Sequence, residues 1–253
     1  MRLSYATPAI VLRSRPFGES DKIVSLLTKD FGKISGIAKG AMRSRKRFVN
    51  SLEPFALVNL RFQDRPHSNL AFILTADLTL GYRQLANSLE SIYHAAYLVE
   101  ITEGLIGERE ESRAVYQHLS DSLRNLEEYG TSLRFLTSFE LKLLRLVGYQ
   151  PVLDRCGRCG KAPLEQAAQP WYFTPVDGGI LCDSCAATKR ETLPLSAKAV
   201  EVLAALQSEN NNLPSPFSLP SAVISEMRAA MLRFIQFHMA REIKSAVFLS
   251  SHR

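Results

Sequence analysis

Long hydrophobic runs are absent from this sequence of 253 residues, in which the longest are five residues, as from Ala95 to Val99. A helix that spans a membrane needs roughly 20 consecutive apolar residues. Met1 to Ile10 is also too short an apolar stretch for a signal peptide, and Arg13 and Arg15 interrupt the segment after it. These absences predict a cytoplasmic protein without a membrane partner.

Recognisable catalytic motifs are missing as well. The sequence contains no phosphate-binding loop, no Gly-x-Gly-x-x-Gly, no Gly-x-Ser-x-Gly and no His-Glu-x-x-His. None of the five histidines is followed by the Glu of a deaminase-type His-x-Glu motif. Neighbouring acids such as Glu110-Glu111 and Glu127-Glu128 fall on polar helix faces, where solvation explains them. We therefore predict no catalytic residue and no enzymatic activity.

Cysteine is rare, but its four copies form two pairs, Cys156-Gly-Arg-Cys159 and Cys182-Asp-Ser-Cys185, with 22 residues between them. Disulfides are rare in the cytosol, and two such pairs of thiolates can enclose one tetrahedral metal ion. Between the pairs, Trp171-Tyr172-Phe173 is strand-like and Asp177-Gly178-Gly179 is typical of a hairpin turn. The pattern predicts one structural Zn²⁺ with four cysteine ligands and no open position for catalysis. Four free or disulfide-bonded cysteines are the alternative.

Positive charge is concentrated in the first third of the chain. Residues 1–80 hold 13 Lys and Arg against 6 Asp and Glu, whereas the remaining residues carry a net charge of −1. Five cations fall between Lys39 and Arg47, on a connection between predicted strands. A clustered basic face favours nucleic acid, and an ordinary solvated loop is the alternative. The predicted nucleic-acid-binding residues are Arg13, Arg15, Lys33, Lys39, Arg43, Arg45, Lys46, Arg47, Arg61 and Arg65.

Aromatic side chains in the same region could stack on bases. The candidates are Phe17, Phe31, Phe48, Phe55 and Phe62. Each is more often a core residue than a contact, because aromatic residues dominate small cores.

Two hydrophobic periodicities divide the chain. Segments with a period of two predict five strands near 6–15, 21–27, 33–38, 58–62 and 70–76, for which a five-stranded OB barrel is the leading candidate. Helical spacing follows over 85–99, 115–126, 133–147, 196–207 and 224–235, and 209–220 is predicted as a loop. The predicted fold class is α+β multidomain. Its parts are an OB-fold domain at 1–80, a first helical part at 81–150, a zinc-binding insert at 151–192 and closing helices at 193–253.

Four stretches resemble, in the same order, the motifs of one known family. They are Ala9 to Asp21, Phe31 to Ala41 with Leu52-Glu53-Pro54-Phe55, Phe139 to Pro151, and Phe173 to Gly179. This ordered set resembles the RecO family of bacterial recombination mediators in DNA repair. The similarity extends over about residues 7–190, whereas the final helices match in pattern more than in motif.

The resemblance implies an N-terminal OB barrel, a helical middle, an inserted zinc module and closing helices. Family members bind single- and double-stranded DNA and anneal complementary strands. With RecR they help to load RecA on single strands coated by the single-strand binding protein SSB. Contact with the acidic tail of SSB needs an apolar pocket with a basic rim, for which Arg134, Lys142 and Arg145 are candidates. The resemblance also implies a nucleoid-associated protein of the bacterial cytoplasm.

Two other classes compete with a DNA-binding mediator. An RNA-binding or transcription-associated adaptor is the main alternative, because OB barrels and zinc ribbons are common in such proteins. A nuclease is the other, and it is disfavoured because the sequence shows neither convergent acids nor an open metal shell. The mediator is therefore our leading hypothesis.

Overall fold

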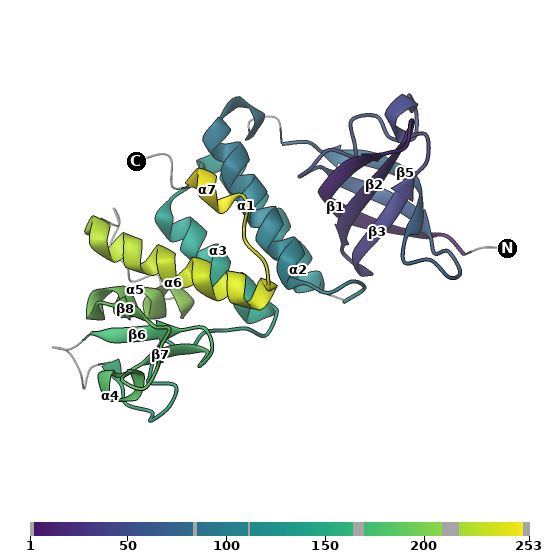
Figure 1. Ribbon diagram of the computed structural model, residues 1–253. Helices are drawn as coiled ribbons and strands as arrows, with labels where there is room; N and C mark the ends of the chain where they lie inside the picture. Colours follow the sequence, from purple (N-terminus) through teal and green to yellow (C-terminus); the bar gives the residue numbers. More distant parts are fainter. Residues whose placement is uncertain (1–2, 83–84, 111, 164–169, 209–217, 250–253) are drawn as a thin grey trace. The chain divides into compact units, whose positions relative to one another are not determined.

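The computed structural model describes residues 3–82, 85–110, 112–163, 170–208 and 218–249. Contacts divide the chain into two units, Met1–Gly130 with Val247–Arg253, and Thr131–Ala246. Helices and strands carry the labels of Figure 1. No helix among the described residues is long and apolar enough to cross a membrane.

The first unit contains a closed five-stranded barrel (Figure 1). Its strands are β1 (Tyr5–Phe17), β2 (Asp21–Thr28), β3 (Gly32–Ala38), β4 (Leu57–Gln63) and β5 (Ala71–Leu80). They follow the order β1-β2-β3-β5-β4, and every pairing is antiparallel except that of β3 with β5. This order confirms the predicted OB barrel.

Alternating side chains explain why these segments close into a barrel. In β4, Val58, Leu60 and Phe62 are buried, while Asn59 and Arg61 between them are exposed. Successive strand residues point to opposite faces, so the apolar set forms the interior. Gly36 lies where β3 meets β5 and leaves room for Ile73 of β5, because a Cβ at Gly36 would lie 2.4 Å from Cδ1 of Ile73 and the Ile73 side chain would have to move.

The first unit also contains the long helices α1 (Leu89–Leu105) and α2 (Arg113–Tyr129), which pack against each other and against β1. Each begins after a serine whose hydroxyl accepts the backbone N–H three residues further on, which is a favourable N-cap. The predicted stripe began at Leu85, but η2 (Leu85–Asn87) forms a 3₁₀ turn before the cap. The short α7 (Ala246–Leu249) places Phe248 against Tyr93 of α1, with ring centroids 4.6 Å apart.

The second unit combines helices with a three-stranded sheet of order β7-β6-β8. Its elements are α3 (Leu133–Leu146), β6 (Trp171–Thr174), β7 (Gly179–Leu181), α4 (Asp183–Ala186), β8 (Leu193–Leu195), α5 (Ala197–Gln207) and α6 (Ser221–Met239). Phe173 packs edge-on against Phe234 of α6, with ring centroids 5.5 Å apart, and Trp171 is fully buried. Glu140 of α3, also fully buried, accepts a hydrogen bond of 2.7 Å from Arg228 of α6. The sheet and helices therefore share one core.

The predicted hairpin of the insert is confirmed by β6 and β7, which pair across the turn at Asp177-Gly178. Strand β8 was not predicted; it pairs with β6 and has only three residues, Leu193–Leu195, with Pro194 at the centre. Of the predicted loop at 209–220, residues 209–217 lie outside the described part of the chain.

Candidate metal centre and nucleic-acid interface

The four cysteines converge on one point of the second unit. Their Sγ atoms all lie within 4.8 Å of one another. Cys156 and Cys182 are buried, whereas Cys159 is exposed and Cys185 is partly exposed. The Sγ atoms of Cys159 and Cys182 are 3.7 Å apart, well beyond the ~2.05 Å of a disulfide bond. The structure thus supports four convergent thiols that could hold a metal ion.

Backbone hydrogen bonds present these thiols. The N–H of Gly157 donates to the carbonyl of Ile180 at 2.9 Å, which ties the first cysteine loop to β7. Gly179 permits a second tie, to Val152, because a Cβ at this position would lie 2.1 Å from the Val152 carbonyl oxygen. The β6–β7 hairpin therefore carries the second cysteine pair to the first.

Electrostatics show why the cluster suits a cation. Burial raises the pKa of the Cys156 thiol, but backbone N–H groups of Cys159, Cys182 and Arg158 outweigh it and lower the pKa to about 6. One of them, the N–H of Cys182, lies 3.4 Å from the Cys156 sulfur. Hydrogen bonding to Cys182 raises the pKa of Cys185 to about 12. The Cys156 thiolate therefore forms readily, whereas the raised pKa values of Cys182 and Cys185 oppose loss of their protons, and a bound cation is what makes several thiolates compatible.

The basic loop, defined as residues 39–47, is the first part of the connection from β3 to β4 and includes the 3₁₀ turn η1 (Ala41–Arg43). It is tied to the β1–β2 hairpin by two bonds. The N–H of Gly40 donates to Oδ1 of Asp21 at 2.8 Å, and the N–H of Met42 donates to the carbonyl of Ser20 at 2.9 Å. The backbone of the loop therefore has a defined position at one end of the barrel.

All five cations of the basic loop are exposed: Lys39, Arg43, Arg45, Lys46 and Arg47. The Arg47 guanidinium donates to the Lys39 carbonyl at 2.7 Å and lies over the Phe48 ring, with Cζ 5.0 Å from its centroid. Hydrogen bonding to the Gly40 N–H is the main reason that the pKa of Asp21 lies below its usual value. A charged Asp21 thus anchors a loop that presents positive charge to solvent.

The other predicted contacts divide into two kinds. Arg15, Arg61 and Arg65 are exposed. Arg13 donates through Nε to Oε2 of Glu103 at 3.1 Å, and its side chain is about half exposed (55%). The Lys33 ammonium donates to the backbone carbonyls of Glu103 at 2.9 Å and Ile106 at 2.6 Å. Arg13 and Lys33 therefore connect the barrel to the C-terminal end of α1.

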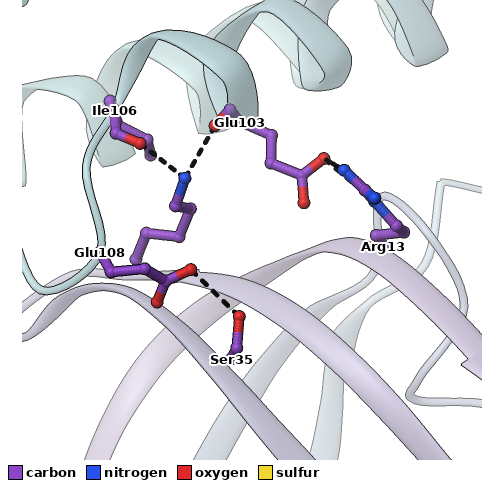
Figure 2. A network of polar contacts seen from close by, with 6 residues as sticks. Arg13, Ser35, Glu103, Ile106 and Glu108 are labelled. Atoms are coloured by element: carbon purple, nitrogen blue, oxygen red, sulfur yellow. Dashed lines mark hydrogen bonds and ion pairs between the residues drawn. The ribbon is translucent and has the colours of Figure 1, made fainter. Parts of the chain in front are cut away.

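Figure 2 shows this connection from close by, with a further bond in which the Ser35 hydroxyl donates to Oε1 of Glu108 at 3.0 Å. Cations at a helix C-terminus are favourable because its last carbonyls are unpaired within the helix and carry partial negative charge. Glu103 on α1 and Glu108 in the segment after the helix were not predicted, since nothing local marks an acid as the partner of a strand residue far away in the sequence.

The candidate aromatic residues also divide. Phe48 and Phe62 are buried, and Phe31 packs against Phe62 with ring centroids 5.4 Å apart. Phe55 is partly buried, whereas Phe17 is 52% exposed. Four of the five therefore contribute to packing. The candidates for a basic pocket rim, Arg134, Lys142 and Arg145, all lie on α3 of the second unit.

A closed OB barrel with an exposed basic loop, followed by helices and four convergent cysteines, defines an OB-fold protein with a four-cysteine site that could hold a metal ion. Comparison with known families narrows this class. Residues 1–82 match the family model described as Recombination protein O N terminal, and residues 86–246 match Recombination protein O C terminal. The chain belongs to the RecO family.

Curated relatives agree with this assignment. The chain is 32% identical over 246 residues to the DNA repair protein RecO of Syntrophus aciditrophicus, covering 96% of this chain and 94% of the relative. It is 34% identical over 240 residues to the DNA repair protein RecO of Anaeromyxobacter dehalogenans, covering 95% and 93%. The similarity therefore includes both the barrel and the unit that carries the cysteines.

Proposed function

We propose that this protein is a non-enzymatic, DNA-binding recombination mediator in DNA repair. Two facts support the proposal: the chain belongs to a family whose curated members are named DNA repair protein RecO, and the basic loop presents five exposed cations from an anchored backbone. The anchored basic loop is the observation that carries the DNA-binding part. A DNA-repair role assigns the protein to the nucleoid of the bacterial cytoplasm.

The mechanism follows from the chemistry of phosphates. Two complementary strands repel each other, and cations that neutralise phosphates on both strands lower this repulsion while releasing counterions. The proposed phosphate-binding set is the basic loop with Arg15, Arg61 and Arg65. In this mechanism the protein binds single- and double-stranded DNA and anneals complementary strands. With RecR, it helps to load RecA on single strands coated by SSB, whose acidic tail would bind near the basic side chains of α3.

The four cysteines are proposed to hold one structural Zn²⁺. Zinc favours tetrahedral thiolate shells, and four sulfurs within 4.8 Å of one another match such a shell. Four protein ligands leave no position for a reacting water, so the ion would stabilise the fold of the insert. Zinc measured in protein purified without a chelator tests this assignment, and metal-free folded protein would contradict it.

The test of DNA binding reverses the charge of the loop. The variant carries Arg43→Glu, Arg45→Glu, Lys46→Glu and Arg47→Glu. The control reverses four exposed cations elsewhere, Arg124, Arg155, Lys198 and Arg233, and therefore has the same net charge. Affinity for single-stranded DNA is measured over a range of salt concentrations, together with annealing of complementary strands coated by SSB.

We expect the loop variant to bind more weakly, with a salt dependence flatter by about one unit per lost phosphate contact, and to anneal poorly. The control should retain most of the affinity and its salt slope. A folded loop variant that binds and anneals like the wild type would refute the role of the loop. A clear preference of the wild type for structured RNA would favour an RNA-binding adaptor instead.

A further inference from the structure

Phe17 differs from the other Phe and Tyr residues of the barrel. Among the described barrel residues, 3–80, it is the one Phe or Tyr side chain that is more than half exposed. It is the last residue of β1, at the β1–β2 hairpin. Exposure of one apolar residue needs no explanation by itself, because such residues are common on protein surfaces. Its surroundings are what give this ring a function.

The backbone connects Phe17 to the basic loop in two steps. Phe17 is paired with Asp21 across the hairpin, and the Asp21 carboxylate accepts the N–H of Gly40 at the start of the basic loop. The carbonyl of Ser20, between them in the hairpin, accepts the N–H of Met42, whose side chain is 51% exposed. Phe17 and Met42 thus lie at the end of the barrel that presents the basic loop.

The alternation of side chains along β1 places Arg15 on the same face of the strand as Phe17. Successive strand residues alternate, so Arg15 and Phe17 point to one side of β1 and Pro16 to the other. Arg15 is exposed. Arg15, a proposed phosphate contact, and the ring of Phe17 therefore lie two residues apart on an exposed face of β1. The basic loop is bonded to the hairpin in which this strand ends.

A ring and a thioether gain nothing from a phosphate, but they can pack on the face of a base. In a duplex the base faces are stacked on each other, whereas in a single strand they are accessible, and aromatic platforms within a basic groove are how single strands are held without sequence preference. We propose that Phe17, together with Met42 of the basic loop, stacks on an unpaired base while the basic loop and Arg15 hold the adjacent phosphates. This end of the barrel thus adds a base contact that only single-stranded nucleic acid can make.

This inference rests on the proposed function, because it uses the basic loop as the phosphate site. It goes further by separating two parts of the affinity. The cations act on any polyanion, whereas Phe17 acts only where a base is exposed. Removing the ring should therefore change the preference among ligands rather than the response to salt.

The experiment compares three ligands with the same number of phosphates per strand. They are an oligothymidylate of about 16 nucleotides, which is the upper end of the site size of one OB fold, an abasic deoxyribose-phosphate oligomer, and a duplex. The variants are Phe17→Ala and Phe17→Leu. The matched control is Tyr129→Ala, which removes another exposed aromatic ring of the same unit. Thermal unfolding checks that each variant folds.

We expect Phe17→Ala to weaken binding of oligothymidylate roughly 5- to 100-fold, the effect of losing one stacked base. Phe17→Leu should be nearly as weak, because it keeps apolar volume but has no ring. Affinity for the abasic oligomer and for the duplex should stay within about 2-fold in both variants, with an unchanged salt slope, since phosphate contacts set that slope. The control should bind all three ligands like the wild type.

A fluorescence measurement tests the same contact directly. The chain has one tryptophan, Trp171, which is fully buried, so Phe17→Trp adds an exposed emitter at the proposed platform. Oligothymidylate should quench its emission at saturation, and the abasic oligomer should not. Equal quenching by both oligomers would overturn the stacking contact.

The outcomes separate the inference from the function on which it rests. If the wild type binds none of the three ligands, the proposed DNA-binding function fails, and the inference fails with it. If the wild type binds and the loop reversal abolishes binding, but Phe17→Ala weakens all three ligands equally or none, only the stacking inference is refuted.

Discussion

Replacing Lys33 by Met separates the two roles that a barrel cation can have. The ammonium donates to the carbonyls of Glu103 and Ile106, at 2.9 and 2.6 Å, where α1 ends. Methionine keeps the length and the apolar stem of the side chain but loses the charge and the donors. We expect Lys33→Met to loosen the last turn of α1 and to leave DNA binding nearly unchanged.

The magnitude follows from these two bonds. A hydrogen bond to a charged group contributes about 1.5–3 kcal/mol, and a cation at a helix C-terminus about 0.3–1 kcal/mol. Lys33 is only partly buried, so water replaces part of what is lost, and the two bonds share one charge. We therefore expect a local loss of about 2 kcal/mol, equivalent to roughly 30-fold faster amide exchange in the affected turn.

Hydrogen exchange measured by mass spectrometry on peptides covering residues 99–107 tests this expectation, together with the salt dependence of DNA binding. Lys39→Met is the control, because Lys39 is an exposed cation of the basic loop. It should leave exchange in α1 unchanged and lower the salt slope by about one unit. If Lys33→Met instead leaves exchange unchanged and lowers the slope as Lys39→Met does, Lys33 contacts phosphate and our assignment of its structural role is wrong.

Three further predictions concern the four cysteines, the Glu140–Arg228 ion pair of the second unit and the bond from Gly40 to Asp21. Removing the metal by chelation, or replacing Cys159 by Ser, should increase the rate of amide hydrogen exchange mainly within residues 152–190, because a structural zinc supplies much of the folding free energy of a small module. An increase spread evenly over the chain would contradict this. Arg228→Met should destabilise the second unit by about 3 kcal/mol in urea unfolding, because it removes the cation that forms an ion pair with the fully buried Glu140. A loss below about 1 kcal/mol would show that the pair is dispensable. The pKa of Asp21 in the folded protein lies below its usual 3.8. The stabilisation of the loop by the charged carboxylate is therefore fully present above pH 3.8 and is lost as the pH falls through the pKa of the folded state. The Gly40 amide resonance should shift over this pH range in the wild type and not in Asp21→Asn.

The barrel could be predicted because its information is local. Alternation around Asn59 and Arg61 identifies a half-buried strand without knowledge of its neighbours, and five such segments of even spacing leave few architectures. The boundaries were less certain, since β1 extends to Phe17 beyond the predicted Arg15. β8 has too few residues for any period to show, and only its pairing with β6 defines it.

The candidate site was predictable to different degrees in its two parts. The cysteines could be paired from their spacing alone, because a tetrahedral thiolate site fixes the number and type of its ligands, and the structure brings all four together. Charge density identified the basic loop but could not distinguish the environment of Lys33 from that of Lys39. That distinction depends on where α1 ends, which is a tertiary property.

Position on the barrel therefore decides what each cation does. Lys33 and Ser35, two residues apart in β3, share its outer face, and the end of α1 lies on this face. Lys33 therefore donates to carbonyls at the end of the helix, and Ser35 donates to the Glu108 carboxylate. Lys39 follows the last residue of β3, beyond the reach of those helix groups, and its charge remains in solvent. The positive excess of the first 80 residues is thus divided between attachment of the helix and presentation to a polyanion. One part of that charge stabilises the unit from which the other part is presented, so net charge alone overstates the number of phosphates that this barrel can neutralise. We therefore expect the number of phosphate contacts derived from the measured salt slope to be smaller than the ten predicted from the sequence.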